Sequence, residues 1–557
     1  MNYLRIDILN RIKHRAGKRV KKSSFIKRQT VSQAAIIIAV ITFISKFIGY
    51  VREILIANYF GASGVVDAFL VATIIPSMVL GLFAAGLNTL IIPVYIEKKA
   101  RDPVYAKKFV NWVFLVWGTI FLFASILVLI FAPFLVKLVA VGFTGERFTL
   151  AVNITRYLTL SGYLSILTGL FTGLFHSEKQ FLLPTIVSFV ANWIIVLSIA
   201  LLTPYLGINS WTVGQTLFAI ISFTSLFYIL YKRYGFFHKL SFKGIEWREI
   251  YKFTILLLPL IVSGGIGTLN TIVDRTIAST LDVGSIAALN FAGRVWAIPI
   301  SLLAGPIATA VFPGFSELAV GKDKIKDYSY MLNKTIAIMW YFIIPASLIF
   351  ITLSEPIVRV LFQRGAFDVK ATQVTSFAVS MYSIGLFAHA ANPLLGRVFY
   401  SYKNTITPVI ISICTVGLNI FLNIVLGRLI GAGGIALATS LSVTFGFIVY
   451  NITVRKYLIP FTKRLAIETV KIILCSTVVG GVSYLSLPFF RGNLGFIALV
   501  VRLLLVGLFA GGIYLVLSYL LKVEGFFFFR EKFYQAVVKV PILNRIPFIK
   551  RVSSSNK

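Results

Sequence analysis

Long apolar runs divided by short charged linkers recur along this chain and limit what it can fold into. We count fourteen such runs, centred from about residue 45 to about residue 508. Each is long enough to cross a bilayer, which takes about 20 residues of helix. A transmembrane β-barrel would instead show short segments in which polar and apolar residues alternate. With 58% hydrophobic and 13% charged residues, the sequence predicts an all-α polytopic membrane protein with fourteen transmembrane helices.

The linkers alternate in charge. Those after spans two, six, eight and twelve are rich in Lys and Arg, whereas 203–210 contains neither. Because basic linkers stay in the cytoplasm, both termini are predicted to be cytoplasmic. One outer linker differs, since Arg359, Arg364 and Lys370 surround the sequence F-Q-R-G-A-F-D. The net charge of +35 fits contact with anionic membrane lipids and does not indicate nucleic acid as a partner.

The chain matches itself at a nearly constant offset, which indicates an internal repeat. This offset pairs Arg52 with Arg275, Gly61 with Gly284, Asp67 with Asn290, Pro76 with Pro299, Lys179 with Lys403 and Gly207 with Gly431. These pairs predict two six-helix bundles of like orientation, related as parallel repeats, plus two extra C-terminal helices. The predicted divisions are a basic cytoplasmic arm at 1–32, an N-terminal bundle at 33–235, a C-terminal bundle at 245–457, helices thirteen and fourteen at 464–522, and a basic amphipathic cytoplasmic tail at 523–557.

Several ionisable residues interrupt the apolar runs, where an uncompensated charge costs about 2.5–3.5 kcal/mol. They are Lys46, Arg52, Glu53 and Asp67 in spans one and two, and Asp274, Arg275 and Arg294 in spans seven and eight. Two bundles packed about a central axis would leave a cavity lined by these spans. Arginine suits the capture of phosphate oxygens, so the hypothesis is a cationic cavity for a large anionic lipid-linked substrate. The alternative is that these charges pair with one another and close the bundle.

A second polar group combines Asp274 with Asn419, Asn423 and Thr439. Asn419 and Asn423 are four residues apart and share one helix face. Their oxygens are of the kind that a Na⁺ site uses, but the spacing alone favours ordinary hydrogen bonds between helices. The sequence has no P-loop and no nucleotide-binding fingerprint, so it predicts neither an enzyme nor an ATP-driven pump.

Four ordered motifs resemble the MurJ (MviN) family of lipid II flippases. They are R-E-I-L-I-A-N-Y-F-G-A-S-G-V-V-D-A-F from Arg52, V-D-R-T-I-A-S-T-L-D-V-G-S-I-A-A-L-N-F-A-G-R from Val273, F-Q-R-G-A-F-D from Phe362 and R-V-F-Y-S-Y-K-N-T-I-T-P from Arg397. The resemblance covers about residues 33–522. It implies the fold of the MOP exporter superfamily, in which two lobes alternate access to a cationic cavity and a groove on spans thirteen and fourteen receives a polyprenyl tail. The implied protein is a monomeric flippase of the cell inner membrane that moves the peptidoglycan precursor lipid II.

The resemblance also assigns residues. Arg52 and Arg294 match family arginines needed for the pyrophosphate-bearing head group, and Lys46 stands where many members have Arg. Glu53 and Asp67 match acidic positions of the first two helices. The residues that fall on a family sodium site are Asp274, Asn419, Asn423 and Thr439, with Asn423 standing where a described site has Asp. Na⁺ is therefore a candidate coupling ion, and no other cofactor is expected.

One stretch departs from the family pattern. Members usually carry a basic pair and then A-E-G after the Pro of span two, whereas Pro76 is here followed by an apolar stretch that includes Leu80 and Gly86. A cavity arginine and a glutamate are therefore missing. This departure keeps open a flippase for another polyprenyl-pyrophosphate-linked glycan, such as an exopolysaccharide or O-antigen precursor. A MATE-type drug or cation antiporter is a further alternative, although its cavity would need acidic rather than cationic lining.

Overall fold

The computed structural model describes residues 31–238, 240–319, 324–457, 461–492 and 494–538, and all elements in these ranges are helical. Most of the predicted arm and residues 539–557 of the predicted tail lie outside them. The elements of the first half are α2 (Val31–Phe60), α3 (Gly64–Pro76), η1 (Ser77–Gly81), α4 (Leu82–Arg101), α5 (Pro103–Val139), α6 (Gly145–Ser177), α7 (Leu182–Leu206), α8 (Asn209–Ile229), η2 (Leu230–Tyr234) and α9 (Trp247–Ala278). Those of the second half are α10 (Ser285–Pro299), η3 (Ile300–Ala304), α11 (Gly305–Ala319), α12 (Ile325–Thr352), α13 (Ser354–Phe362), α14 (Val369–Ile384), α15 (Leu386–Ser401), α16 (Ile406–Val454), α17 (Lys463–Leu485), η5 (Leu487–Phe490), α18 (Phe496–Leu520) and α19 (Glu524–Val538).

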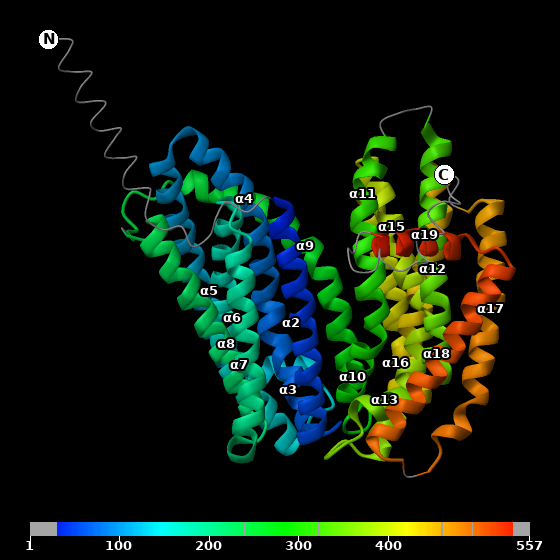
Figure 1. Cartoon of the computed structure of the whole chain (residues 1–557). Coiled ribbons are helices and arrows are strands. Elements are labelled where there is room, and N and C mark those ends of the chain that lie inside the picture. Colours follow the sequence, from blue (N-terminus) through cyan, green and yellow to red (C-terminus); the bar gives the residue numbers. More distant parts are fainter. Residues whose placement is uncertain (1–30, 239, 320–323, 458–460, 493, 539–557) are drawn as a thin grey trace.

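The helices form two lobes that converge at one end of the molecule (Figure 1). We call α2 to η2 the N-lobe and α10 to α16 the C-lobe. The end where α4 and α15 finish carries the Lys- and Arg-rich linkers, and we call it the basic end; the lobes meet at the opposite end. Helix α9 connects the lobes, because it packs on α4 and α5 near its start and on α16 further along.

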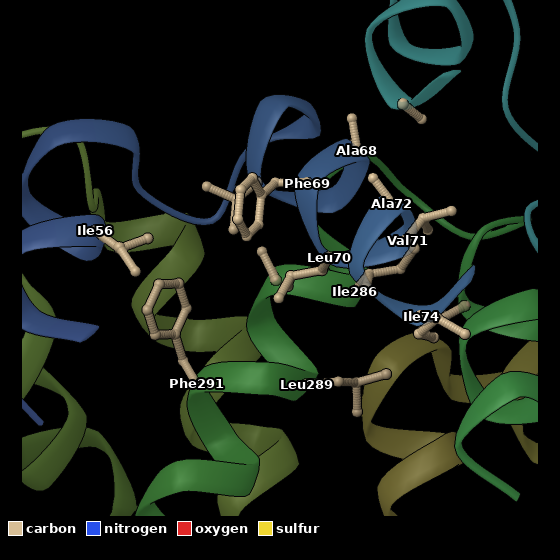
Figure 2. Packing of buried hydrophobic residues seen from close by; sticks show 14 of the residues in the cluster. Ile56, Ala68, Phe69, Leu70, Val71, Ala72, Ile74, Ile286, Leu289 and Phe291 are labelled. Carbon is tan, nitrogen blue, oxygen red and sulfur yellow. The ribbon is translucent and has the colours of Figure 1, made fainter. Parts of the chain in front are cut away.

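Hydrophobic packing explains why the lobes meet at only one end. One buried cluster belongs to the C-lobe, with contributions from α17, α18 and Val523, and another to the N-lobe and the start of α9. A third cluster, at the opposite end, contains residues of both lobes. Within it, Leu70 and Ile74 of α3 lie beside Ile286 and Leu289 of α10, and Phe291 faces Ile56 of α2 (Figure 2). The interior between the lobes is therefore sealed by a shared core at the opposite end.

The described chain supports a polytopic membrane protein. Ten of its helices are long and apolar enough to span a bilayer, or eleven when α14 and α15, which meet at a bend of 45°, count as one span. Large apolar side chains of α18 are exposed, such as Leu508 at 74% and Phe509 at 65%, as expected of a surface that meets lipid. The predicted fourteen transmembrane helices are reached from these eleven spans by adding α2 and α9 and by dividing the 49-residue α16 into two spans at Gly431. The number fourteen therefore stays a prediction.

The predicted repeat recurs in backbone conformation. The π-helical turns η1 and η3 begin at Ser77 and Ile300, two positions that the repeat pairs, and each turn follows a proline. The repeat also pairs two residues with left-handed backbone conformation, Lys179 at φ 59° and Lys403 at φ 58°. Each follows the end of an equivalent helix, α6 or α15. Such conformations are uncommon for residues other than glycine, so their recurrence supports the repeat independently of sequence identity.

The basic outer linker, which breaks the charge pattern, has a structural explanation. Arg359 donates to the carbonyl oxygens of Phe490 at 3.0 Å and Gly492 at 2.8 Å. The guanidinium of Arg364 lies 5.0 Å from the centre of the Phe496 ring. These cations fasten α13 to the connection between α17 and α18, so they serve packing at the opposite end.

The end of the described chain is also fastened. Helix α19 lies across the transmembrane helices of the C-lobe (Figure 1). The buried Glu468 of α17 accepts from the backbone N–H of Glu524 at 2.9 Å, and Arg464 forms an ion pair with the Glu524 side chain. A Cβ at Gly525 would lie 2.5 Å from the Tyr341 ring, so glycine permits this close contact with α12. The described part of the predicted tail is therefore a helix, and its first residues are fastened to α17 and α12.

Candidate functional site

A cavity of about 640 Å³ lies between the two lobes. Five of the six predicted substrate residues line it, namely Lys46, Arg52 and Glu53 of α2, Arg275 of α9 and Arg294 of α10. Aromatic residues also line it, among them Tyr50, Trp296 and Tyr382. The charges that were far apart in sequence therefore meet at one cavity, as the cationic-cavity hypothesis requires.

Glu53 is the centre of the charged group. Its side chain is only 2% exposed, and its Oε1 lies 3.1 Å from Arg52 Nη2 and 3.3 Å from Arg294 Nε. Asn290 donates to Oε2 at 3.4 Å. Arg294 remains half exposed to the cavity, at 51%. One buried carboxylate thus holds two guanidinium groups that come from different lobes.

Further contacts tie α2 to α10 and η3 across the cavity. The Tyr50 hydroxyl donates to the Arg294 carbonyl oxygen at 3.1 Å, and Lys46 Nζ donates to the Ser301 carbonyl oxygen at 3.4 Å. Ser301 lies in the π-helical turn η3, where the regular i to i−4 pairing of the helix is interrupted. A cation of the N-lobe thus contacts a backbone carbonyl oxygen within the π-helical turn of the other lobe.

Asp67 does not line the cavity and lies instead at the junction of the lobes. Its side chain is 2% exposed, and its two oxygens accept from the backbone N–H groups of Gly284 and Ala287, each at 2.7 Å. These groups are at the N-terminus of α10, where unsatisfied N–H groups and the helix dipole favour an anion. A residue of the N-lobe therefore caps a helix of the C-lobe. Arg147 lies 3.8 Å from the same carboxylate.

Backbone contacts reinforce this closure. The Ala366 N–H donates to the Asn58 carbonyl oxygen at 2.9 Å. A Cβ at Gly365 would lie 2.2 Å from the Asn58 carbonyl oxygen, and a Cβ at Gly61 would lie 2.3 Å from that of Ala366. Both glycines have positive φ, of 55° and 63°. The F-Q-R-G-A-F-D segment, whose composition gave no hint of its role, thus joins the C-lobe to the end of α2.

Arg275 belongs to both regions. It lines the cavity, and its Nη1 donates to the carbonyl oxygen of Leu70 in α3. The same arginine therefore adds positive charge to the cavity and bonds α9 to the N-lobe near the shared core.

The predicted cation residues also come together. Asn423 Nδ2 donates to Asp274 Oδ1 at 2.6 Å and to Asn419 Oδ1 at 2.8 Å, and Asn419 Nδ2 lies 3.4 Å from Thr439 Oγ1. Asn270, which the sequence reading missed, lies 3.5 Å from Asp274 Oδ2. It stands four residues before Asp274, so the spacing that grouped Asn419 with Asn423 could have found it.

This group fits a small cation in its donor chemistry. Asn423 Oδ1 is buried, and no hydrogen-bond donor of the described chain reaches it. Asn419 can also turn its amide, so that its nitrogen donates to Asp274 Oδ1 at 3.1 Å and Asn270 Oδ1 at 2.9 Å. One carboxylate, several amide oxygens and a hydroxyl would thus be available to a hard cation.

Leu80, which stands in the stretch where relatives usually carry basic residues, is fully buried in the N-lobe core. Gly86, further along the same stretch, is also buried, and a Cβ there would lie 2.8 Å from Leu257 of α9. This part of span two therefore packs against the N-lobe and α9 and adds no charge to the cavity.

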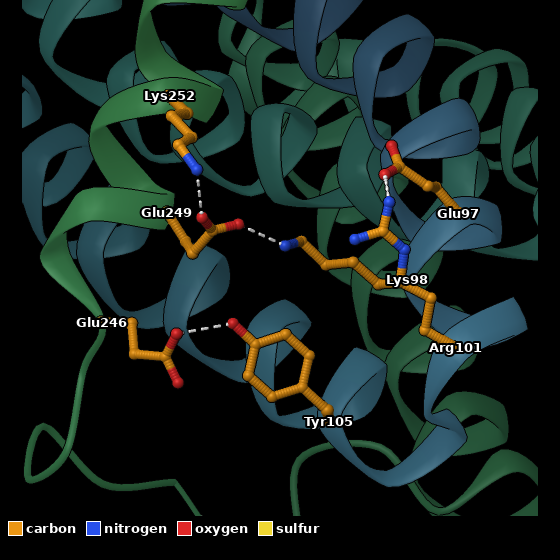
Figure 3. A network of polar contacts seen from close by, with 7 residues as sticks. All are labelled: Glu97, Lys98, Arg101, Tyr105, Glu246, Glu249 and Lys252. Atoms are coloured by element: carbon orange, nitrogen blue, oxygen red, sulfur yellow. Dashed lines mark hydrogen bonds and ion pairs between the residues drawn. The ribbon is translucent and has the colours of Figure 1, made fainter.

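A polar network at the basic end fastens the start of α9 to the N-lobe (Figure 3). Glu249 lies between Lys98 of α4, at 2.5 Å, and Lys252, at 2.7 Å. The Tyr105 hydroxyl donates to Glu246 at 2.7 Å. Since α9 also packs on α16 of the C-lobe, this anchor makes α9 a physical link between the two lobes.

Sequence comparisons match most of the chain to known proteins. The family model described as lipid II flippase MurJ matches residues 56–505. A probable lipid II flippase MurJ of Thermotoga maritima is 28% identical over 486 residues, which are 87% of this chain and 95% of the relative. The lipid II flippase MurJ of Thermosipho africanus is 28% identical over 433 residues, 76% of this chain and 86% of the relative.

Solved structures extend the comparison. A lipid II flippase MurJ in an inward closed conformation superposes with a TM-score of 0.74 at 27% identity, covering 89% of this chain and all of the other. A MATE family multidrug resistance transporter of the MOP superfamily in an inward-facing conformation gives a TM-score of 0.61 at 14% identity, over 76% of this chain and 94% of the other. The second match concerns the fold alone.

Proposed function

Because the chain belongs to the MurJ family of lipid II flippases, we propose that it carries lipid II from the cytoplasmic to the outer leaflet of the cell membrane by alternating access. It is a multi-span membrane transporter and not an enzyme. The observation that carries the proposal is the Arg52–Glu53–Arg294 group, in which cations of both lobes face one cavity closed at the opposite end.

The pyrophosphate of the substrate would compete with Glu53 for the two arginines. Guanidinium groups bind phosphate oxygens through two parallel hydrogen bonds, and arginine keeps its charge when water is removed. A pyrophosphate held by Arg52 and Arg294 would draw the lobes together around the cavity. Substrate binding would then favour an occluded state, because the affinity for that state would exceed the affinity for the open one.

Release to the other side requires the closure at the opposite end to open. Opening would separate Asp67 from α10 and expose shared-core side chains such as Leu70 and Ile286 to water. Exposing each large apolar side chain costs about 1.5–3 kcal/mol. The closure is therefore strong enough to require compensation from substrate, ion or membrane potential.

The direction of transport follows from the linkers. Basic linkers surround the end toward which the lobes separate, and such linkers remain in the cytoplasm. The cavity would then receive its substrate from the cytoplasmic leaflet. The exposed apolar faces of α17 and α18 support the proposal that the polyprenyl tail runs along these helices.

Na⁺ is the proposed coupling ion. Asp274, Asn419, Asn423 and Thr439 would hold it, with Asn270 as an added ligand. The ion would neutralise Asp274 and join α9 to both halves of α16. Because the group contains one carboxylate, its affinity for Na⁺ should be lower than that of a site with two carboxylates.

A flippase for another polyprenyl-pyrophosphate-linked glycan is the second candidate, and it is not favoured, because the matching family model and the relatives are lipid II flippases. The two candidates share the pyrophosphate and differ in the sugar. A drug antiporter is disfavoured, since the cavity is lined by four cationic side chains and two carboxylates, Glu53 and Asp274.

The test is translocation of fluorescent lipid II by the purified protein in vesicles. Arg52→Ala and Arg294→Ala should each abolish translocation, and lysine at either position should restore it only in part, because an ammonium lacks the planar fork. The control is Arg101→Ala, whose side chain is 79% exposed at the basic end. Wild-type rates in both alanine variants would refute the cationic-cavity mechanism. Transport of a different lipid-linked glycan, with no transport of lipid II, would favour the second candidate.

A further inference from the structure

The C-lobe contains a second cavity, of about 650 Å³, between α15, α16 and α9. It is lined by polar residues at one end, including Asn392, Asn419 and Ser442, and reaches Tyr400 and Pro408 at the other. Tyr400 is 48% exposed, and it stands near the end of α15, at the basic end of the bundle. The helical stretches from Asn419 to Pro408 and from His389 to Tyr400 each rise about 16 Å.

The second cavity and the central cavity share a wall. Asn270, His389 and Thr439 line both of them. Asp274 lines only the central cavity, and Asn419 lines only the second one. The proposed cation group therefore lies between the two cavities and can be approached from either.

The charges of the two cavities differ. The central cavity is lined by four cations (Lys46, Arg52, Arg275 and Arg294) and two carboxylates (Glu53 and Asp274), a formal charge of four minus two, or +2. Within the described chain, the second cavity is lined by one charged side chain, Arg397, a formal charge of +1. The Arg397 guanidinium lies 5.3 Å from the centre of the Phe312 ring. Like charges repel strongly where the dielectric is low, so a cation meets a higher barrier in the central cavity.

The second cavity also has polar atoms that could solvate an ion. Asn392 donates to the Val443 carbonyl oxygen at 3.0 Å, but its own Oδ1 is buried and meets no donor of the described chain. His389 Nδ1 is also buried and has no hydrogen-bond partner within the described chain. Buried polar groups normally have partners, so water in this cavity would satisfy both.

We propose that the second cavity is the cation's own route between the basic end and the Asp274 group, separate from the route of the glycolipid. The inference rests on the ion site proposed above. Its consequence is that the cation exchanges while a lipid-linked head group occupies the central cavity.

Two glycines allow each cavity to be filled selectively. A Cβ at Gly396, in the second cavity, would have the Tyr450 hydroxyl oxygen as its nearest neighbour at 3.7 Å, and a Cβ at Gly49, in the central cavity, would have no atom within 4 Å. Alanine is therefore tolerated at both positions, and leucine would occupy the respective cavity. Gly396→Leu and Gly49→Leu form a matched pair, with the alanine variants as controls.

The experiment measures binding and release of radioactive ²²Na⁺ by the full chain in lipid nanodiscs. Gly396→Leu should slow release at least tenfold, whereas Gly49→Leu and saturating polyprenyl pyrophosphate should change it less than twofold. If Gly49→Leu slows release and Gly396→Leu does not, the route is wrong. If Asp274→Ala retains wild-type binding, or the wild type binds no Na⁺, the proposed ion site itself fails.

A second measurement tests the route without the Gly396→Leu substitution, in case that variant folds poorly. Ser412 lines the same cavity, so Ser412→Cys, in a chain whose exposed Cys414 is replaced by serine, can be modified with a small cationic thiol reagent after folding. Modification should slow ²²Na⁺ release in the same way. Unchanged release from fully modified protein would overturn the route.

Discussion

Asp67→Asn should open the closure between the lobes. The carboxylate accepts two backbone N–H groups at 2.7 Å in a fully buried position. Hydrogen bonds to a charged group contribute about 1.5–3 kcal/mol each, and a helix terminus adds up to about 2 kcal/mol. Asparagine keeps one acceptor oxygen but loses the charge and the second bond. The closed state should lose about 3 kcal/mol, roughly a 150-fold change in the ratio of closed to open molecules.

Electron paramagnetic resonance can measure this shift as a distance between spin labels. Tyr205 of α7 and Val369 of α14 are 84% and 59% exposed at the opposite end, one in each lobe. Labels on Tyr205→Cys and Val369→Cys, with Cys414 and Cys475 replaced by alanine, should show a new population at longer distance when Asp67 becomes Asn.

The matched control is Asp282→Asn, which removes an exposed carboxylate two residues before Gly284. It should leave the distance distribution of the spin labels unchanged. An identical distribution in Asp67→Asn and wild type, with both proteins folded, would refute the claim that this cap holds the lobes together.

Two further predictions concern the closure and the orientation. Gly365→Ala should weaken the closure and reduce translocation, because its Cβ would lie 2.2 Å from the Asn58 carbonyl oxygen. Gly492→Ala is the control for backbone strain alone, since Gly492 also has a positive φ but a Cβ there would have no atom within 4 Å. Equal losses of translocation in both variants would contradict the contact argument. Reporter fusions after Lys108 and Lys557 should both report the cytoplasm, and a periplasmic signal from either would contradict the orientation.

The cavity could be predicted from sequence because its charges are exceptional where they stand. A lysine or arginine within an apolar run is costly, so Arg52 and Arg294 attract attention without any structure. The internal repeat then placed them on facing helices. Five of the six predicted substrate residues line the cavity for this reason.

The role of Asp67 could not be predicted in the same way. A capping residue is normally recognised because it immediately precedes its own helix. Asp67 caps a helix of the other lobe, which begins far later in the chain, so no local pattern marks it. The contacts of Gly61 and Gly365 escaped notice for a related reason, since they join backbone groups of two distant segments.

The π-helical turns change how the sequence of span two must be read. A π-helical turn holds about one residue more than an α-helical turn, and one residue corresponds to about 100° of rotation. In an unbroken α-helix, the face that contains the buried Ile75 would recur about every 3.6 residues. After the π-helical turn Ser77–Gly81, the fully buried residues Leu87 and Ile91 lie about one residue later in the sequence than that spacing predicts. The π-helical turn Ile300–Ala304 inserts one extra residue at the equivalent place in the second copy of the repeat. The two copies therefore align without a gap. A sequence alignment of the copies does not reveal that, in both helices, a different face is buried after the turn.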